Sequence, residues 1–233
     1  MLGPRRQDGR QLLKEGVGVL TETGGRMTAW DDVTGSELDA ESVRRAREVE
    51  MQFFKDMNAY TRCSRDCVEK EGGKIIDLKW IDTNKGDSAN PNYRSRLVGR
   101  EYNTYKDNSL YAATPPLEAL RVILSFAATV DEDGPKQVMV NDVSRAYFYA
   151  AVQRSLFIEL PAEDVEAKKG EVGRLNVCLY GTRDAAKSWQ QALSSHLISL
   201  GFKRGKGYPA VFHHPSWRLK TRSRRRLLLG RIS

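Results

Sequence analysis

The spacing of apolar residues changes from helical to alternating near Gly72-Gly73. Before that pair, an acidic start after Ser36 and mixed charges predict a helical extension over residues 37–73. The extension has few apolar positions with which to dock, and they include Met51, Phe54 and Met57. Residues 1–36 are rich in Gly, Thr and charge and show no sustained period, so we expect them to be disordered or loosely attached.

A strand hairpin is predicted next. Residues 74–82 have strand character, Asn84-Lys85-Gly86-Asp87 is typical of a turn, and residues 92–102 form the returning strand. Side chains alternate between the two faces of a strand. One face of the second strand therefore carries Arg94, Arg96, Val98 and Arg100. The sequence predicts a hairpin with a basic face.

The remaining pattern predicts helices and strands in an irregular order. Pro116 suits the first turn of a helix. The expected buried stripe of that helix is Leu117, Leu120, Leu124, Ala127 and Ala128. We expect strands at 137–143, 156–160 and 174–179, a short helix at 144–152, and a helix from Asp184 to Gly201. Since no βα unit repeats, the fold class is α+β and not a doubly wound sheet.

Charge is distributed unevenly along the chain. The formal net charge is +8, and residues 185–233 contain eleven Lys and Arg but no Asp or Glu, so this stretch carries all of the positive excess. Such a stretch attracts phosphate backbones whatever their sequence. A solvated basic tail is the alternative, and charge alone does not separate the two.

Composition also bears on location. No apolar run approaches the roughly 18 residues that span a bilayer, and the N-terminus lacks the apolar stretch of a secretory signal. Three cysteines indicate no disulfide framework, so we expect an intracellular protein, cytoplasmic or nuclear, without a membrane partner. Cys63 and Cys67 are spaced to share a helix face; surface thiols are the favoured interpretation and a zinc site is the weaker alternative.

Asp142 is the first candidate for chemistry. It follows Val138-Met139-Val140-Asn141, so we expect its carboxylate at the end of a buried strand, with one edge free to bind a hard cation such as Mg²⁺. Taken alone, an Asp after a strand is more often a cap or a turn residue. Its sequence neighbours change that balance.

Several blocks of sequence carry a family resemblance. They are Lys79-Trp80-Ile81-Asp82, Tyr93-Arg94-Ser95-Arg96-Leu97-Val98-Gly99-Arg100, Asn141-Asp142-Val143-Ser144-Arg145-Ala146-Tyr147-Phe148, and the Leu179-Tyr180-Gly181 segment with the helix after it. Leu200-Gly201-Phe202-Lys203 and Tyr208-Pro209-Ala210-Val211-Phe212 continue the series. In this order, over about residues 74–214, they resemble the reverse transcriptase of copia-type retrotransposon Pol polyproteins.

The resemblance implies an RNA-directed DNA polymerase folded as an incomplete right hand of fingers and palm. It makes Asp142 a catalytic ligand of Mg²⁺, with the backbone carbonyl of Val143 helping to hold the nucleotide-bound ion. Tyr147 would select deoxynucleotides by blocking the 2′-hydroxyl, and an ordinary core aromatic is the alternative. The implied partners are an RNA template, a DNA primer and deoxynucleotides.

The resemblance also implies binding residues on the hairpin and beyond it. Arg94 and Arg96 would grip the incoming triphosphate, because guanidinium groups bind phosphate oxygens in pairs. Arg100, Tyr180 and Gly181 would lie against nucleic acid or nucleotide. The alternatives are a solvated hairpin face and a simple strand-to-helix turn.

The sequence departs from the family pattern beyond Trp217. The family places two adjacent aspartates in a hairpin soon after the segment matching Val211-Phe212, whereas this chain has no Asp after Asp184. One carboxylate cannot hold two divalent ions about 4 Å apart. We therefore predict a reverse-transcriptase fragment over residues 74–217, inactive alone, followed by a basic tail over 218–233 that is foreign to the family.

Two other hypotheses stay open. A non-catalytic RNA- or DNA-binding protein would use the Arg94–Arg100 face and the basic tail with Arg224, Arg225 and Arg226. A translated relic without a stable fold would leave an edge strand unpaired and prone to aggregate. A frameshift, a splicing change or a wrong gene model would explain the basic ending.

Overall fold

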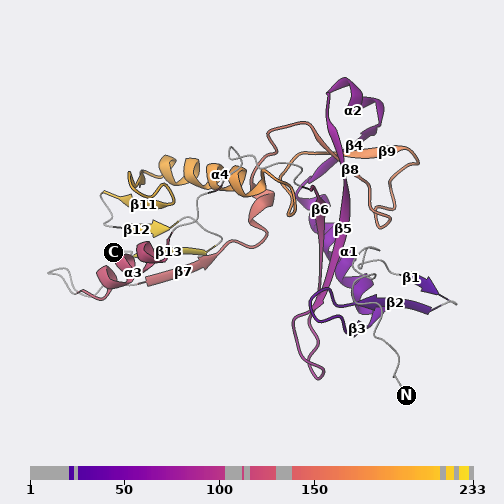
Figure 1. Ribbon diagram of the computed structural model, residues 1–233, viewed down its shortest axis with the longest axis horizontal. Coiled ribbons are helices and arrows are strands. Elements are labelled where there is room, and N and C mark those ends of the chain that lie inside the picture. Colours follow the sequence, from indigo (N-terminus) through magenta and orange to yellow (C-terminus); the bar gives the residue numbers. More distant parts are fainter. Residues whose placement is uncertain are drawn as a thin grey trace, which may run out of the picture. The chain divides into compact units, whose positions relative to one another are not determined.

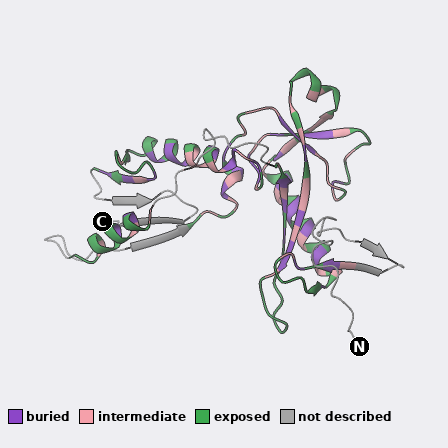
Figure 2. Cartoon of the chain, in the orientation of Figure 1, coloured by how far each residue is buried: buried purple, intermediate pink, exposed green. Residues whose placement is uncertain are grey.

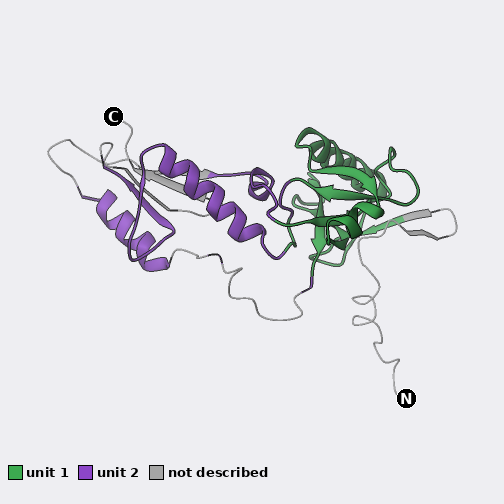
Figure 3. Ribbon diagram, turned by 90° about the horizontal axis from the view of Figure 1, so that it is seen from above, with its two compact units in different colours: residues 1–101, 154–176, 180–182 green, residues 102–153, 177–179, 183–233 purple. Residues whose placement is uncertain are grey.

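The structure is a computed structural model in which the chain divides into two compact units (Figure 3). It describes residues 21–23, 26–102, 112, 116–129, 138–215, 219–222 and 226–230. Unit 1 comprises residues 1–101, 154–176 and 180–182, and unit 2 comprises residues 102–153, 177–179 and 183–233. Each unit is thus assembled from segments that are separated in the sequence.

A five-stranded mixed sheet is the frame of unit 1 (Figure 1). Its strand order is β4 (Tyr60–Ser64), β9 (Glu171–Leu175), β8 (Leu156–Glu159), β5 (Lys74–Asn84) and β6 (Tyr93–Arg100). β5 pairs with β8 in parallel, and the other neighbours in this sheet pair antiparallel. The predicted hairpin is confirmed as β5–β6, and the strand predicted at 156–160 is β8. The strand predicted at 174–179 is β9, which begins and ends earlier.

Helix α1 (Ala40–Asp56) packs against β6. Asp39 caps its start by accepting a hydrogen bond from the Ser42 N–H at 2.8 Å. Met51 and Phe54 are buried as predicted, and the same face also buries Val43. The apolar positions at helical spacing therefore attach α1 to the sheet.

The helical prediction for residues 37–73 is wrong beyond α1. Asn58 adopts a left-handed conformation with φ of 47°, and the chain then enters β4 before the short helix α2 (Asp66–Lys70). Residues 60–64 form a strand because their backbone pairs with the distant strand β9, which outweighs their local helical propensity. Cys63 and Cys67 thus lie on β4 and α2 and not on one helix face; burial and a hydrogen bond with Cys67 raise the pKa of Cys63.

Part of the N-terminal segment also differs from the prediction of disorder or loose attachment. β1 (Thr21–Thr23), β2 (Arg26–Trp30) and β3 (Glu37–Leu38) form an antiparallel sheet in that order. Ala29 and Leu38 pack with Val43 of α1 in a small core, which gives this polar segment an apolar anchor. Residues 1–20 lie outside the described part of the chain.

The described part of unit 2 contains two longer helices, a 3-10 turn and short strands. The helices are α3 (Leu117–Ala127) and α4 (Ala185–Ser199), and the 3-10 turn η2 (Ala146–Tyr149) lies where a short helix is predicted. β7 (Val138–Asp142) pairs with β13 (Arg226–Gly230), and β10 (Lys203–Arg204), β11 (Val211–His214) and β12 (Leu219–Arg222) form a second sheet. Helix α4 matches its prediction from Asp184 to Gly201, whose φ is +91°. Its inner face, purple in Figure 2, packs Leu193 and Leu197 on Phe202 and Phe212.

The buried stripe predicted for α3 is rotated in the structure. Ala119 and Ile123 are buried, Leu120 and Ala127 are half-buried, and Leu117 and Leu124 are exposed. Every side of this helix carries apolar residues, so the sequence pattern leaves the direction of its buried face undecided. The helix itself is confirmed.

Residues 218–233, predicted as a basic tail, contain the strands β12 and β13. β12 pairs with β11, and β13 pairs with β7 along its whole length. Leu227, Leu228 and Leu229 supply the apolar run that suits β13 to a strand, despite the arginines around it.

Among the described helices, none combines the length and apolar character that crossing a bilayer requires.

Candidate nucleotide, nucleic-acid and metal site

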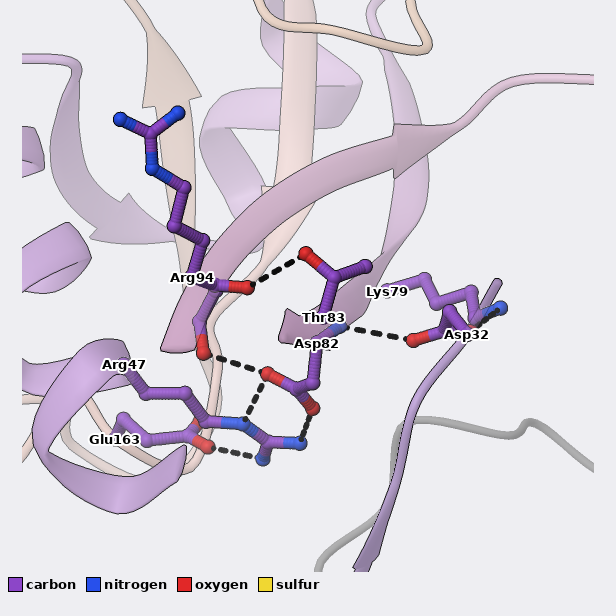
Figure 4. Close-up of polar contacts among 8 residues, drawn as sticks. Asp32, Arg47, Lys79, Asp82, Thr83, Arg94 and Glu163 are labelled. Atoms are coloured by element: carbon purple, nitrogen blue, oxygen red, sulfur yellow. Dashed lines mark hydrogen bonds and ion pairs between the residues drawn. The ribbon is translucent and has the colours of Figure 1, made fainter. Parts of the chain in front are cut away.

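A buried ionic cluster fixes the β5–β6 hairpin on α1 (Figure 4). The side chain of Arg47 on α1 is 4% exposed, and it donates to Asp82 Oδ2 at 2.6 Å and to Glu163 Oε1 at 2.8 Å. Asp82 on β5 also accepts a hydrogen bond from the Ser95 hydroxyl at 2.6 Å, which ties in β6. Arg47 Cζ lies 5.0 Å from the ring centroid of Trp80. Because the buried charges compensate each other, the cluster holds both strands in place.

Two adjacent carboxylates tie the N-terminal strands to the same hairpin. Asp31 Oδ2 accepts from the Asn84 N–H at 2.8 Å, and Asp32 Oδ2 accepts from the Asp82 N–H at 2.9 Å. Lys79 Nζ lies 2.8 Å from Asp32 Oδ1. Burial would raise the pKa of Asp31, but backbone N–H donors outweigh burial and hold that pKa below its usual value. Both carboxylates are engaged in positioning the hairpin.

β6 presents its arginines on one face, as the alternation of its sequence predicts. Arg94, Arg96 and Arg100 are exposed, and the residues at the alternate positions between them are buried. Figure 4 shows the Arg94 side chain extending away from the acidic cluster. Arg96 Cζ lies 5.7 Å from the ring centroid of Tyr180, within the range of a cation–π contact. Guanidinium groups beside an aromatic ring are a combination suited to phosphates and bases.

The segment that carries Tyr180 lies directly against β6. The Gly99 N–H donates to the Tyr180 carbonyl at 2.7 Å. Gly181 has φ of +86°, and a Cβ added there would lie 2.0 Å from the Gly99 carbonyl oxygen. Only glycine fits such a close approach of two backbones. Three of the predicted binding residues, Arg96, Tyr180 and Gly181, are therefore brought together in unit 1.

The residues predicted for the catalytic centre, Asp142, Val143 and Tyr147, lie in unit 2. Asp142 is exposed at the carboxyl end of β7, and Val143 follows it half-buried. Tyr147 lies in η2, which follows Arg145 in a left-handed conformation with φ of 50°. The Tyr147 ring is half-buried and packs on the cluster of Ala150, Cys178 and Ala185. Tyr147 therefore packs against the core, as the alternative interpretation of this residue expects.

The metal ligands implied by the resemblance are incomplete in the described residues. No three His, Cys, Asp or Glu side chains gather there in a group that could hold a metal ion. The strand beside β7 is β13, whose Arg226 is the register partner of Asp142. Arg224 and Arg225 lie outside the described residues, as does the side chain of Arg226. A single carboxylate does not supply the ligands of a pair of Mg²⁺ ions.

Sequence reasoning misses the ionic cluster around Asp164 in unit 1, as it misses the one around Arg47. The fully buried Asp164 carboxylate accepts from Arg62 Nη2 and from the Tyr60 hydroxyl, both at 2.6 Å. Burial would raise the pKa of Asp164, but these two donors outweigh burial and lower it. Arg62 and Lys55 also pair with Glu166, at 3.0 and 2.8 Å, beside a pocket of about 530 Å³. The partners are distant in the sequence, and no local signal marks them.

Comparison with known proteins identifies the family of the chain. Residues 66–216 match the family described as reverse transcriptase (RNA-dependent DNA polymerase). The chain is 26% identical over 184 residues to the retrovirus-related Pol polyprotein from transposon TNT 1-94 of Nicotiana tabacum, covering 76% of the chain and 13% of that polyprotein. It is 26% identical over 133 residues to the one from transposon RE2 of Arabidopsis thaliana, covering 55% and 9% respectively.

A fungal relative extends the comparison. The chain is 27% identical over 154 residues to the transposon Ty1-MR1 Gag-Pol polyprotein of Saccharomyces cerevisiae, covering 64% of the chain and 8% of that polyprotein. The chain thus spans about a tenth of the length of these relatives. The family match covers most of the chain and includes Asp142, the β5–β6 hairpin and the Tyr180-Gly181 segment. The chain therefore belongs to the reverse transcriptase family found in the Pol polyproteins of copia-type retrotransposons.

Proposed function

We propose that unit 1 and unit 2 are fingers and palm parts of a reverse transcriptase, and that this chain does not polymerise DNA by itself. The observation that supports this most is the incomplete donor set at Asp142. Template-directed synthesis by this family depends on carboxylates that hold two divalent ions. Here the strand next to β7 carries Arg226 in register with Asp142, and no Asp follows Asp184.

Primer extension tests this proposal. The purified chain is incubated with a primed RNA template, deoxynucleotides and Mg²⁺ or Mn²⁺, beside an active reverse transcriptase as positive control. We expect no extension above that of the Asp142→Asn variant. Extension by the parent chain that this substitution abolishes would show that Asp142 is catalytic and that the proposal is wrong.

A second candidate function is binding of nucleic acid without catalysis. The observation that favours it is the exposed row of Arg94, Arg96 and Arg100, with Arg96 beside the Tyr180 ring. Phosphate contacts by such arginines release counterions, so binding weakens steeply as salt rises. A stacked aromatic ring adds contact with bases of any sequence. The fold can supply this surface whether or not the metal site is complete.

Salt titration of RNA binding tests the second function. Arg94→Gln combined with Arg96→Gln is compared with Arg44→Gln combined with Arg45→Gln, an equal charge change on the exposed side of α1. For single-stranded RNA we expect the β6 pair to lower the salt slope by about 1.4, since each lost phosphate contact removes about 0.7. The α1 pair leaves the slope nearly unchanged. Equal changes of the salt slope in the two double variants would exclude the β6 face as the binding surface. The same titration with Arg224, Arg225 and Arg226 neutralised measures the contribution of the basic ending.

A further inference from the structure

The pocket of about 530 Å³ beside the Arg62–Asp164 pair lies at the β4 edge of the five-stranded sheet in unit 1. Its lining includes Phe54, Lys55, Tyr60, Thr61, Arg62 and Glu166, which come from the end of α1, from β4 and from the loop between β8 and β9. β4 and β6 are the opposite edges of this sheet, so four strand spacings, roughly 19 Å, separate them. The pocket is therefore distinct from the nucleotide site predicted at Arg94 and Arg96 on β6.

Two cations in this pocket already hold a carboxylate. Lys55 Nζ lies 2.8 Å from Glu166 Oε1, and Arg62 Nη1 donates to Glu166 Oε2 at 3.0 Å, so each oxygen has its own cationic partner. The Glu166 side chain is 57% exposed. Exposed ion pairs of this kind contribute little to the stability of a fold. Glu166 therefore occupies an anion site from which a competing anion can displace it at low cost.

The guanidinium of Arg62 and the ring of Tyr60 are both held from behind by Asp164. Arg62 Nε and Nη2 donate to this buried carboxylate at 3.0 and 2.6 Å, and the Tyr60 hydroxyl donates to it at 2.6 Å. One buried carboxylate thus orients a cation and an aromatic ring together. Since both groups are already ordered, a ligand that binds them loses less free energy to the ordering of side chains.

Tyr60 provides an aromatic wall next to the two cations. A Cβ added at Gly173 of β9 would lie 2.9 Å from Tyr60 Cδ2, so the lack of a side chain there lets the ring lie close to the sheet. Tyr60 is half-buried and lines the pocket, and its ring centroid is 6.4 Å from that of Phe54. Bases of any kind stack on aromatic rings, and phosphate oxygens accept charge-assisted hydrogen bonds from Lys and Arg. A nucleotide combines these two kinds of group in one molecule.

We propose that this pocket binds the 5′-phosphate and the base of a nucleotide, either free or at the end of a strand, and that the phosphate takes the place of Glu166 between Lys55 and Arg62. A phosphate monoester carries a charge of about −1.5 to −2 at pH 7, so it attracts the two cations more strongly than a single carboxylate does. The base lies against Tyr60. The volume of the pocket, about 530 Å³, falls in the range of roughly 300–1,000 Å³ that is usual for small-molecule sites.

This site goes beyond the proposed function, because it does not depend on whether the chain polymerises DNA. Its lining residues, apart from Glu166, precede residues 66–216, the segment that matches the reverse transcriptase family. Glu166 acts in it as an internal competitor of the nucleotide.

The sign of one substitution separates a competitor from a structural ion pair. If Glu166 competes, Glu166→Gln strengthens nucleotide binding by roughly 2- to 10-fold, because binding no longer has to break two exposed ion pairs. If Glu166 only fastens its loop, the same substitution leaves binding unchanged or weakens it. Lys55→Gln removes a phosphate partner and weakens binding. Glu159→Gln is the matched control, since it removes an exposed carboxylate that pairs with Arg65 outside the pocket.

Isothermal titration calorimetry of the full chain with AMP measures the dissociation constants, in EDTA so that no divalent ion contributes. Adenosine and ribose 5-phosphate, titrated in the same way, separate the contributions of the phosphate and the base. An oligonucleotide with a 5′-phosphate is compared with the same oligonucleotide with a 5′-hydroxyl, which tests whether a strand end enters the pocket. Circular dichroism and thermal melting check that each variant folds like the parent chain.

We expect AMP to bind the Glu166→Gln variant more tightly than it binds the parent chain or Glu159→Gln, and to bind Lys55→Gln more weakly. Ribose 5-phosphate should bind at least about 5-fold more weakly than AMP, since it lacks the stacked base, and adenosine should bind more weakly still. A preference for the 5′-phosphorylated strand that requires Lys55 would identify the strand end as the ligand, and equal binding of both strands would identify the free nucleotide.

Three results would overturn the inference. They are no binding of AMP by the parent chain and by Glu166→Gln, a gain in Glu166→Gln no larger than that in Glu159→Gln, or binding that Lys55→Gln retains and Arg94→Gln with Arg96→Gln abolishes. The last result would assign the nucleotide to the β6 face. Primer extension is a separate measurement, and its outcome refutes or supports only the proposed lack of polymerase activity.

Discussion

Replacing Arg47 by Met tests how strongly the buried ionic cluster stabilises unit 1. The guanidinium is almost fully buried and makes charge-assisted hydrogen bonds of 2.6 Å to Asp82 and 2.8 Å to Glu163. Met keeps most of the apolar stem of Arg, so the substitution removes the charge with little loss of packing. Asp82, whose side chain is 2% exposed, is then left as a buried charge with the Ser95 hydroxyl as a remaining partner.

The expected loss follows from that uncompensated charge. Removing one partner of a buried ion pair costs about 3–5 kcal/mol, and loss of the contact with Trp80 adds about 0.5–1 kcal/mol. A small domain has a total stability of about 5–15 kcal/mol. With a urea slope of about 2 kcal/mol per molar, the unfolding midpoint of unit 1 falls by roughly 2–3 M. Adding Asp82→Asn to Arg47→Met recovers part of this loss, because it removes the orphaned charge.

Urea denaturation followed by circular dichroism measures the effect, with hydrogen exchange of the Asp82 and Asn84 amides reporting on the hairpin itself. Arg44→Met is the matched control, since Arg44 lies on the same helix and forms exposed ion pairs with Glu41 and Glu48. We expect it to leave the midpoint nearly unchanged. Equal midpoints for the Arg44 and Arg47 variants would show that burial of this cluster does not decide stability.

Two further predictions concern unit 1. Gly181→Ala is expected to destabilise the chain by more than about 2 kcal/mol, because left-handed strain of about 1–2 kcal/mol is added to a clash with the Gly99 carbonyl. Gly72→Ala, which has φ of +59° and open space around it, is the control and carries the strain alone; equal losses in thermal melting would argue against the clash. The pKa of Asp164 is lowered in the folded state, so its stabilisation is present above the unfolded pKa of about 3.9 and is lost as pH falls through the folded value. Urea midpoints from pH 6 to pH 3 should therefore fall less steeply for Asp164→Asn than for the parent chain, and parallel curves would refute the role of the Arg62–Asp164 pair.

Local sequence signals predict those helices and strands that are bounded by turn or cap residues in the same segment. The β5–β6 hairpin follows from two alternating stretches joined by Asn84-Lys85-Gly86-Asp87, and α4 follows from a helical period between Asp184 and Gly201. The exposed arginine face of β6 follows from the same alternation. In each case the turn or cap residues and the period of the pattern lie within one short segment.

Strands and ion pairs that form between segments far apart in the sequence cannot be predicted from local signals. Tyr60–Ser64 forms a strand because β9 lies beside it, although the segment continues a helical pattern. The Arg62–Asp164 pair joins residues far apart in the sequence, and the partner of Asp142 is set by the register of β13. Asp142 itself is found from its place at a strand end, whereas its charge environment depends on which strand pairs with β7.

The discontinuity of unit 1 has a consequence for how the chain is made. During synthesis, β4, β5 and β6 leave the ribosome before the whole of residues 102–153, and β8 and β9 follow only afterwards. β4 pairs with β9, and β5 pairs with β8, so the emerging chain first has a two-stranded hairpin beside an unpaired strand. Parallel and long-range pairings form slowly, and open strand edges bind other chains. Until residues 154–176 have been synthesised, β4 and one edge of β5 therefore stay open to pairing with other chains.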